Sequence, residues 1–183
     1  MIISKIKTNK KLMFLLFFLC LFQLGISQTY TNDDEDSDSQ SGTELNGQEV
    51  SQSVFNSFFD TTPNEDLNTI TGNSVSITQI ASFNTSVVKV ASRASDIKIA
   101  QNGNANNINL TYKVDAVVSD LEQNGNENAI LDYVIDPNAK VSLELKQNGD
   151  GLYFERFGAN SISKNIKFTQ TTASPTVIIR SFN

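Results

Sequence analysis

The chain has no histidine and no tryptophan, and its 183 residues include one cysteine, Cys20, inside an apolar run near the N-terminus. Histidine is the side chain that most often titrates near neutral pH and is the commonest metal ligand. Without it, the chain lacks the usual residue for acid–base catalysis and for metal binding. The acidic run 33–38 lacks the spaced ligands and the glycine of a calcium loop. The sequence therefore predicts no enzyme, no cofactor and no metal site.

Positive charge is missing from one part of the chain. Residues 28–72 carry ten acids and neither lysine nor arginine, a net charge of −10, whereas residues 73–183 carry ten acids and ten bases and sum to zero. No basic stripe is present, which argues against nucleic-acid binding. A segment this acidic buries too little apolar surface to offset the entropy of ordering it. We therefore expect residues 28–72 to be largely disordered, above all residues 28 to about 50.

Apolar residues recur with helical spacing towards the end of this acidic segment, at Val50, Val54, Phe55, Phe58 and Phe59. The spacing predicts a short amphipathic helix. Two interpretations remain open for it. We favour a loose apolar patch that covers the first repeat over a helix that binds a partner.

The first 27 residues show the order of features of a secretory signal. Lysines precede the apolar run 12–24, and the small residues Gly25 and Ser27 follow it before Gln28. The run is shorter than the roughly 20 apolar residues that a membrane span needs. We expect residues 1–27 to be a signal peptide that is removed on export. Cys20 would leave with it, and the exported chain would form no disulfide.

Glutamine returns at a fixed interval in the rest of the chain, in steps of 22, 22, 24 and 23 residues. The positions two and four residues before it are nearly always apolar, as at Val75 and Ile77. Alternation predicts a strand with one buried face, and constant spacing predicts a structural repeat. The glutamines are Gln79, Gln101, Gln123, Gln147 and Gln170.

Each repeat has a second half. Five residues after the first three glutamines an asparagine follows, and beyond it alternating apolar positions again indicate a strand. A glycine comes two residues after three of the glutamines, where a positive φ lets the chain reverse without a steric penalty. The asparagines are Asn84, Asn106 and Asn128, and the glycines are Gly103, Gly125 and Gly149. Each repeat is therefore expected to form strand, tight turn, strand and loop.

Such units bury an apolar face only by stacking, with each strand parallel to the equivalent strand of the next unit, about 4.7 to 4.8 Å away. The sequence predicts an all-β fold, a parallel β-solenoid of about five repeats over residues 73–183. An inward glutamine or asparagine without a partner would cost roughly 1 to 3 kcal/mol. Stacked on identical side chains, each amide can donate to one neighbour and accept from the other. We therefore expect these glutamines and asparagines to form amide ladders.

Two other folds suit parts of the pattern. Evenly spaced short strands also occur in a β-sandwich, but a sandwich gives no reason for glutamine to return at the same strand position. Residues 143–148 contain the Leu-x-Leu-x-x-Asn core of a leucine-rich repeat, but Gly149 and Asp150 follow where that consensus places leucine. The solenoid explains more of the sequence than either.

One acid breaks the inward pattern. Asp132 falls between Ile130 and Val134, at an inward position of a predicted strand. A perturbed carboxylate of this kind can mark an active site, but structural ion pairs produce the same pattern. We expect a shifted register or a lysine partner for Asp132.

The repeats resemble those of curlins, the subunits of the curli fibres of bacterial biofilms. Residues 97–106 and 121–128 match the curlin pattern of an apolar pair, Gln, Gly two residues later and Asn five residues later, although residue 119 of the second copy is serine. The chain departs from the pattern at the second glutamine, at the glycine of the first repeat and at the asparagine of the last two. These positions hold Val90, Tyr112 and Val134, then Ala81, then Leu152 and Pro175. The departures leave open a main, a nucleating or a capping subunit.

The resemblance implies a secreted structural protein whose solenoids stack head to tail into extracellular fibres of a biofilm matrix. Its partners would be other copies of the chain or a related curlin subunit, with export through a curli-type outer-membrane pore helped by chaperones. The fibre would lie at the cell surface. The alternative is a monomeric secreted adhesin or binding module whose outward aromatic residues, with Tyr133, Tyr153 and Phe157 as candidates, contact a ligand.

Overall fold

The structure is a computed structural model that describes residues 42–182. The predicted signal peptide, residues 1–27 with Cys20, and the acidic residues 28–41 lie outside the described residues. Within the described part of the chain, no helix is long and apolar enough to cross a membrane.

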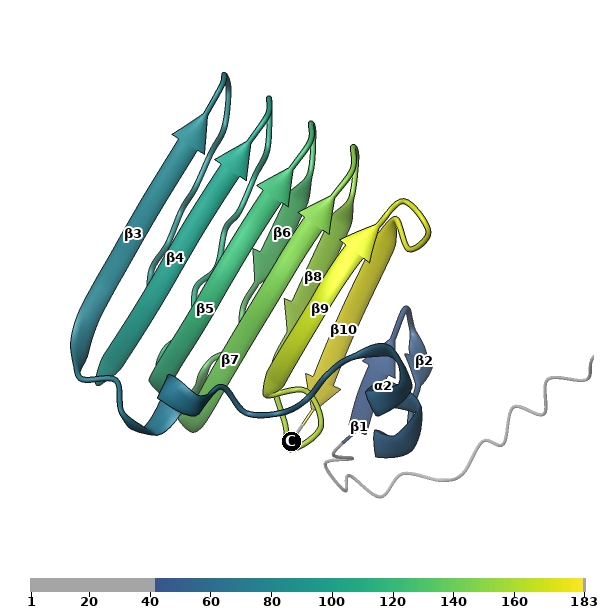
Figure 1. Cartoon of the computed structure of the whole chain (residues 1–183). Coiled ribbons are helices and arrows are strands. Elements are labelled where there is room, and N and C mark those ends of the chain that lie inside the picture. The colour runs from purple at the N-terminus through teal and green to yellow at the C-terminus, as the bar shows by residue number, and fades with distance from the viewer. Residues whose placement is uncertain (1–41, 183) are drawn as a thin grey trace, which may run out of the picture. The chain divides into compact units, whose positions relative to one another are not determined.

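The repeats form a parallel β-solenoid, which confirms the predicted fold class. The first sheet has the strand order β3-β4-β5-β7-β9, and each strand is parallel to the strands beside it. The second runs in the order β2-β1-β10-β8-β6 and lies behind the first in Figure 1. The first sheet contains β3 (Gly72–Ile80), β4 (Ala94–Asn102), β5 (Val114–Asn124), β7 (Asp136–Asn148) and β9 (Asn165–Thr171). The second contains β1 (Gly42–Leu45), β2 (Gln48–Glu49), β6 (Ala129–Asp132), β8 (Tyr153–Phe157) and β10 (Thr176–Phe182).

Each circuit of the chain through both sheets makes one rung, and we number rungs 1 to 5 by their glutamines. The strand register places Gln79 beside Gln101, Gln101 beside Gln123, and so on to Gln170. In rungs 3 to 5 the second half is a strand of the second sheet. In rungs 1 and 2 it is joined to its neighbours by single bridges, from Thr85 to Asn107 and from Asn107 to Ala129.

The core lies between the two sheets and follows from the period-two alternation of each strand. The first sheet contributes residues such as Ile97, Leu121 and Leu143, and the second contributes Ile130 and Phe154, all of them fully buried. Because equivalent residues stack from rung to rung, the core continues along the solenoid through rungs 2 to 5. The inward residues of rung 1 pack against rung 2 on one side only.

The segment before the solenoid differs from the expectation of disorder. Residues 42–49 form a hairpin, and its strand β1 pairs antiparallel with β10 of rung 5. The turn between β1 and β2 is Asn46-Gly47, both with positive φ (51° and 78°), which is the geometry that a two-residue hairpin turn needs. The expectation of disorder was therefore wrong for residues 42–71, because their few apolar side chains find a partner surface on the solenoid.

The predicted amphipathic helix is present as α2 (Gln52–Phe58), with Ser51 as its N-cap. It covers rung 5, whereas we expected it to cover the first repeat. The ring of Phe59 lies 4.6 Å from that of Phe55 and 5.0 Å, edge on, from that of Phe168 in β9. Asp60 then forms a bridge with Lys167 of the same strand. We call residues 42–60 the cap.

The chain returns from the cap to rung 1 across the first sheet, by way of the short 3-10 helix η1 (Glu65–Asn68) (Figure 1). Leu67 packs there on Ala116 and Val118 of β5, and Asn64 donates to the carboxylate of Glu144 at 2.5 Å. This crossing carries the chain from the covered end of the solenoid to the other end. Rung 1 has no cap among the described residues, and every residue of β3 is exposed.

The cap gives a first prediction. Replacing Phe59 with alanine removes the ring that joins α2 to Phe168, and we expect a loss of about 3 kcal/mol of local stability in the cap. Hydrogen exchange of residues 42–60 should accelerate while the strands of rungs 2 to 4 stay protected. Phe58→Ala is the matched control, because that ring is 58% exposed and its loss should change little. Equal protection of the cap in both variants would contradict the packing described here.

Candidate functional site: the amide ladders and the open first rung

The five glutamines lie in one ladder inside the solenoid. Each Nε2 donates to the Oε1 of the next rung, at 2.6 Å from Gln79 to Gln101 and at 2.8 to 2.9 Å along the other three steps. The glutamines of rungs 2 to 5 are fully buried. The ladder has a direction, because every amide donates towards rung 5 and accepts from the side of rung 1.

The same amides join the two sheets. Gln101 donates to the carbonyl of Thr85 (3.2 Å), Gln123 to that of Asn107 (3.0 Å) and Gln147 to that of Ala129 (3.1 Å). At the covered end, Gln170 donates to the carbonyls of Tyr153, Ser174 and Pro175 of its own and the preceding rung. Each buried Nε2 group therefore uses its hydrogens inside the protein, which avoids the cost of an unpaired buried donor.

The asparagines are also in register, but they do not stack side chain to side chain as we expected. Asn84 accepts from the backbone N–H of Asn106 (3.0 Å) and donates to the carbonyl of Gly103 (2.8 Å). Asn106 and Asn128 repeat both bonds with the rung that follows each of them. Each asparagine thus links its own rung to the backbone of the next, beside backbone bonds between the turns such as those from Gly103 to Ile80 and from Ala105 to Ser82.

The glycines fit a constraint that the sequence reading did not include. Gly103, Gly125 and Gly149 have φ values of 120°, 127° and 142°, a region that favours glycine. A Cβ on Gly103 would also lie 2.0 Å from the carbonyl oxygen of Gly125, and one on Gly125 would lie 2.1 Å from that of Gly149. The tight turns of rungs 2 to 4 therefore stack so closely that no side chain fits between them at these φ values.

Two further ladders were missed at the tight turn. Asn102, Asn124 and Asn148 are joined by side-chain bonds of 3.0 Å each. Asn104 donates to Asn126, which donates in turn to Asp150 (3.2 and 3.1 Å). The signal was available in the repeated Gln-Asn-Gly strings, where the residues beside the glutamine and the glycine recur with the same period.

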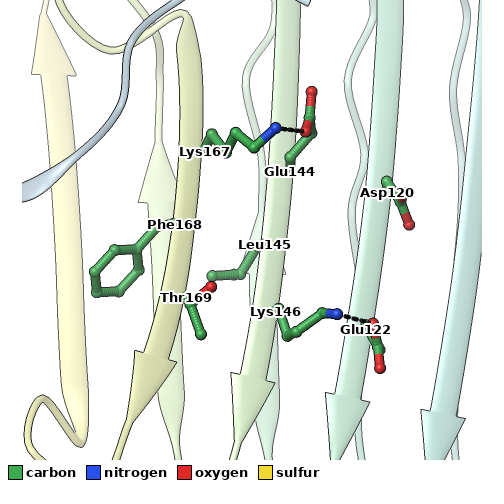
Figure 2. A pocket seen from close by; sticks show the side chains of 8 residues that line it. All are labelled: Asp120, Glu122, Glu144, Leu145, Lys146, Lys167, Phe168 and Thr169. Carbon is green, nitrogen blue, oxygen red and sulfur yellow. Dashed lines mark ion pairs between the residues drawn. The ribbon is translucent and has the colours of Figure 1, made fainter.

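The outer face of the first sheet carries paired charges (Figure 2). Lys146 contacts Glu122 at 2.7 Å, and Lys167 contacts Glu144 at 2.9 Å, each pair joining adjacent strands. The hydrogen bond from Lys146 lowers the pKa of Glu122, and the same contact raises the pKa of Lys146. The depression around them, of about 310 Å³, is lined by these two pairs and by Asp120. Such pairs favour one strand register and are weak stabilisers at an exposed surface.

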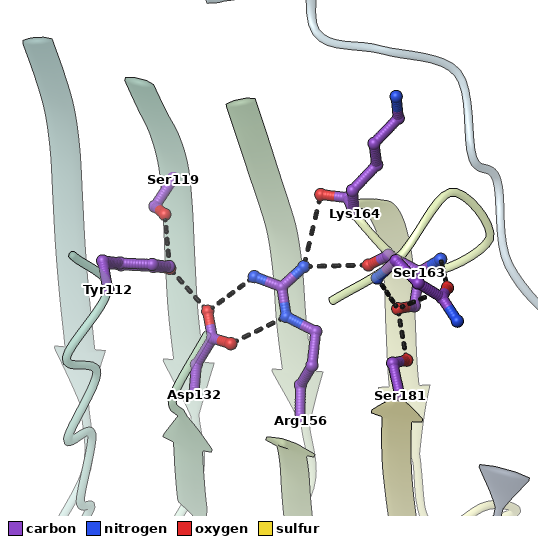
Figure 3. Close-up of polar contacts among 8 residues, drawn as sticks. Tyr112, Ser119, Asp132, Arg156, Ser163, Lys164 and Ser181 are labelled. Carbon is purple, nitrogen blue, oxygen red and sulfur yellow. Dashed lines mark hydrogen bonds and ion pairs between the residues drawn. The ribbon is translucent and has the colours of Figure 1, made fainter. Parts of the chain in front are cut away.

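A polar network is buried between the sheets (Figure 3). Asp132 forms a double hydrogen bond with Arg156, at 2.7 and 2.9 Å, and both side chains are 0% exposed. Tyr112 donates to the same carboxylate at 2.5 Å and contacts Ser119 at 2.8 Å. Arg156 also donates to the carbonyl of Ser163 at 3.1 Å. We expected a lysine partner or a shifted register for Asp132, and both expectations were wrong.

Burial and charge set the protonation states in this network. Burial raises the pKa of the Tyr112 hydroxyl, and the negative charge of Asp132 raises it further. Burial alone would lower the pKa of Arg156, but the charge and hydrogen bonds of Asp132 outweigh it and raise that pKa. Tyr112 is therefore neutral and Arg156 charged over the whole physiological range. All of these contacts are internal, and the network has the geometry of a structural ion pair.

Neither a family model, nor a curated protein, nor a solved structure matches this chain. The curlin resemblance therefore depends on its motif residues alone and stays a prediction. Among the described residues, no group of three or more acids and cysteines is arranged to hold a metal ion.

The open end of rung 1 leaves part of the solenoid interior uncovered. Val75 and Ile77 occupy inward positions there but remain 47% and 46% exposed, because no rung covers them. Within residues 42–182, no hydrogen bond reaches Oε1 of Gln79 or the backbone N–H of Asn84, and the outer edge of β3 pairs with no strand. An uncovered strand edge of this kind is a template for pairing with another chain.

The glutamine ladder gives a second prediction. Gln123→Leu removes the oxygen that accepts from Gln101 and the amide that donates to Gln147 and to the carbonyl of Asn107. We therefore expect the free energy of unfolding to fall by about 2 to 3 kcal/mol. Gln79→Leu at the exposed end is the control and should cost less than about 1 kcal/mol. Urea denaturation followed by circular dichroism measures both. Equal costs would show that burial of the ladder contributes little.

Proposed function

We propose that the chain is a secreted structural protein, a curlin-like subunit that assembles with other solenoid chains into extracellular fibres. The observation that carries this proposal is the open first rung, where a strand edge and two apolar side chains are exposed together. A solenoid with an uncovered rung exposes backbone groups and core residues that only a further rung can satisfy fully. Addition of that rung is the elementary step of fibre growth.

Stacking at this end extends contacts that already exist inside the chain. An added strand parallel to β3, at the usual spacing of about 4.7 to 4.8 Å, would continue the first sheet and cover Val75 and Ile77. The same movement would place a new side chain over Gln79. Assembly thus needs no new kind of contact, only one more repetition of the contact between rungs.

The two ends favour a nucleating or terminal role over that of the main subunit. A head-to-tail fibre grows only if each subunit offers two complementary ends. In this chain the cap covers rung 5 through the pairing of β1 with β10 and the contact of Phe59 with Phe168. A chain open at one end begins or ends a fibre.

The monomeric adhesin remains the second candidate, and one observation favours it. Tyr133 and Phe157 stack face to face at 5.2 Å, and they are 42% and 47% exposed. Exposed apolar surface of this kind can mark a binding site. Tyr153 does not join them, because its hydroxyl donates to Glu155.

Thioflavin T fluorescence over time tests the proposal. The full chain is measured alone and then as a small fraction of a mixture with a second protein that is built of complete Gln-x-Gly-x-x-Asn repeats. We expect the protein to shorten the lag phase of the repeat chain and to be found in fibres that give a 4.7 to 4.8 Å reflection. A chain that stays monomeric, enters no fibre and leaves the lag unchanged would overturn the proposal and favour the adhesin.

A further inference from the structure

The open rung carries a recognition pattern that selects its partner. We infer that rung 1 accepts the C-terminal rung of a different chain, one that ends in a complete Gln-x-Gly-x-x-Asn repeat, and that it does not accept rung 5 of a second copy. This inference rests on the proposed function, and it adds which end binds and which chemistry is bound.

The direction of the glutamine ladder decides which partner group faces Gln79. Inside the solenoid each Nε2 donates towards rung 5, and Oε1 accepts from the preceding rung. Gln79 has used its Nε2 on Gln101, so its Oε1 is the group left to accept. The incoming rung must therefore supply a donor at this position, and a glutamine in the same register does so without changing Gln79.

The asparagine contacts make a second demand. In rungs 2 and 3 the backbone N–H of Asn106 and of Asn128 is bound by the asparagine Oδ1 of the preceding rung. The equivalent N–H in rung 1, that of Asn84, has no such acceptor within residues 42–182. An asparagine five residues after the incoming glutamine would accept from Asn84 and donate to the carbonyl of Ala81, as Asn84 does to Gly103.

The glycine contacts set a third requirement for the partner. A Cβ on Gly103 points at the carbonyl of the following rung and would lie 2.0 Å from it. The residue of an incoming rung that lies over Ala81 stands in the same relation to rung 1. Glycine avoids that collision with the backbone of the interior turns unchanged, whereas Ala81 takes the same place over Gly103 with a different φ, 78°. A partner with glycine two residues after its glutamine is therefore favoured.

The last rung of this chain supplies the glutamine, Gln170, but fails the other two demands. Thr172 takes the place of the glycine and Pro175 that of the asparagine. The amide of Gln170 already donates to carbonyls of its own end, and the cap lies over β9 and β10. Residues 1–41 contain no complete Gln-x-Gly-x-x-Asn string either. The partner is therefore another repeat protein.

Two peptides from the chain itself provide the test. Residues 94–112 form a complete rung with Gln101, Gly103 and Asn106, whereas residues 165–181 form the incomplete last rung. With fluorescent peptides kept at monomeric concentrations, anisotropy against the full chain should show binding of the first at least about tenfold tighter than that of the second. The variants Gly103→Ala and Asn106→Ala of the first peptide should lose that advantage.

Variants of the full chain place the binding at rung 1. Ile77→Lys puts a charge on the inward face of the open strand and should abolish peptide binding. Thr78→Lys, the adjacent residue on the outward face, is the matched control and should bind as the parent does. Equal binding of the two peptides, or binding that survives Ile77→Lys, would overturn the inference.

The outcomes separate this inference from the proposed function. Fibres grown from the purified chain alone would support the proposed function but overturn the inference, because the chain would then stack on itself. A homodimer through β3 that excludes the peptide would overturn the inference as well. Selective peptide binding by a chain that enters no fibre would support the recognition pattern and overturn the proposed function.

Discussion

Replacing Gly125 with alanine is expected to prevent rungs 3 and 4 from stacking at the tight turn, with a loss of about 4 kcal/mol or more in the free energy of unfolding. The added Cβ would lie 2.1 Å from the carbonyl oxygen of Gly149 and 2.9 Å from the carboxylate of Asp150. The backbone at Gly125 has a φ of 127°, which alanine rarely adopts. The closest atom belongs to the backbone, so the rungs must separate or the turn must change its conformation, and an interior turn is held by the rungs on both sides.

Gly151→Ala is the control for this prediction. Gly151 also has a positive φ, 66°, but no atom lies within 4 Å of the site of its Cβ. This variant should cost only the backbone penalty, about 1 to 2 kcal/mol. Urea denaturation of both variants, followed by far-ultraviolet circular dichroism, gives the difference. Equal losses would mean that backbone strain alone explains the glycines and that the close approach of the turns carries no cost.

The period of the glutamines was sufficient to predict the solenoid and its register. Gln101 and Gln123 recur at the same strand position, and no fold without stacked repeats requires that. The apolar residues before them, such as Ile97 and Leu121, alternate with period two and are buried as that period predicts. Both features depend on local spacing, which a single sequence displays directly.

The cap could not be predicted in the same way, because its partner surface is distant in the chain. β1 pairs with β10 across more than a hundred residues, and nothing in the spacing of the repeats distinguishes rung 5 from rung 1 as a site for Phe59. Composition suggested disorder, since the segment is acidic. A few well-placed apolar residues, Phe55 and Phe59 among them, were enough to override that tendency.

The repeats and the cap together account for the open first rung. The proposed partner of rung 1 was inferred from the repeats, because the unused groups of Gln79 and Asn84 are those that interior rungs satisfy. The cap covers the opposite end, and the last rung, with Thr172 and Pro175, lacks the glycine and the asparagine of a complete repeat. Under the proposed function, a chain with these two ends would add to a fibre in one orientation.

Breaking the buried ion pair on one side only is the second large effect that we expect. Asp132→Leu leaves the guanidinium of Arg156 buried without a counter-ion, and Arg156→Met leaves the carboxylate with only Tyr112 as a donor. Each single variant should lose about 3 to 5 kcal/mol. The exposed pair of Arg93 and Asp115 is the control, and Asp115→Asn should cost less than about 1 kcal/mol.

The double variant with Asp132→Leu and Arg156→Met should be more stable than either single variant. The positions stacked beside them along the solenoid hold Leu110 and Ile179, so an apolar pair continues the core on both sides. Tyr112 keeps Ser119 as a hydrogen-bond partner. A double-mutant cycle from urea denaturation measures the coupling, which we expect to be at least about 3 kcal/mol. Additive losses would show that the two charges are stabilised independently by the groups around them and not by each other.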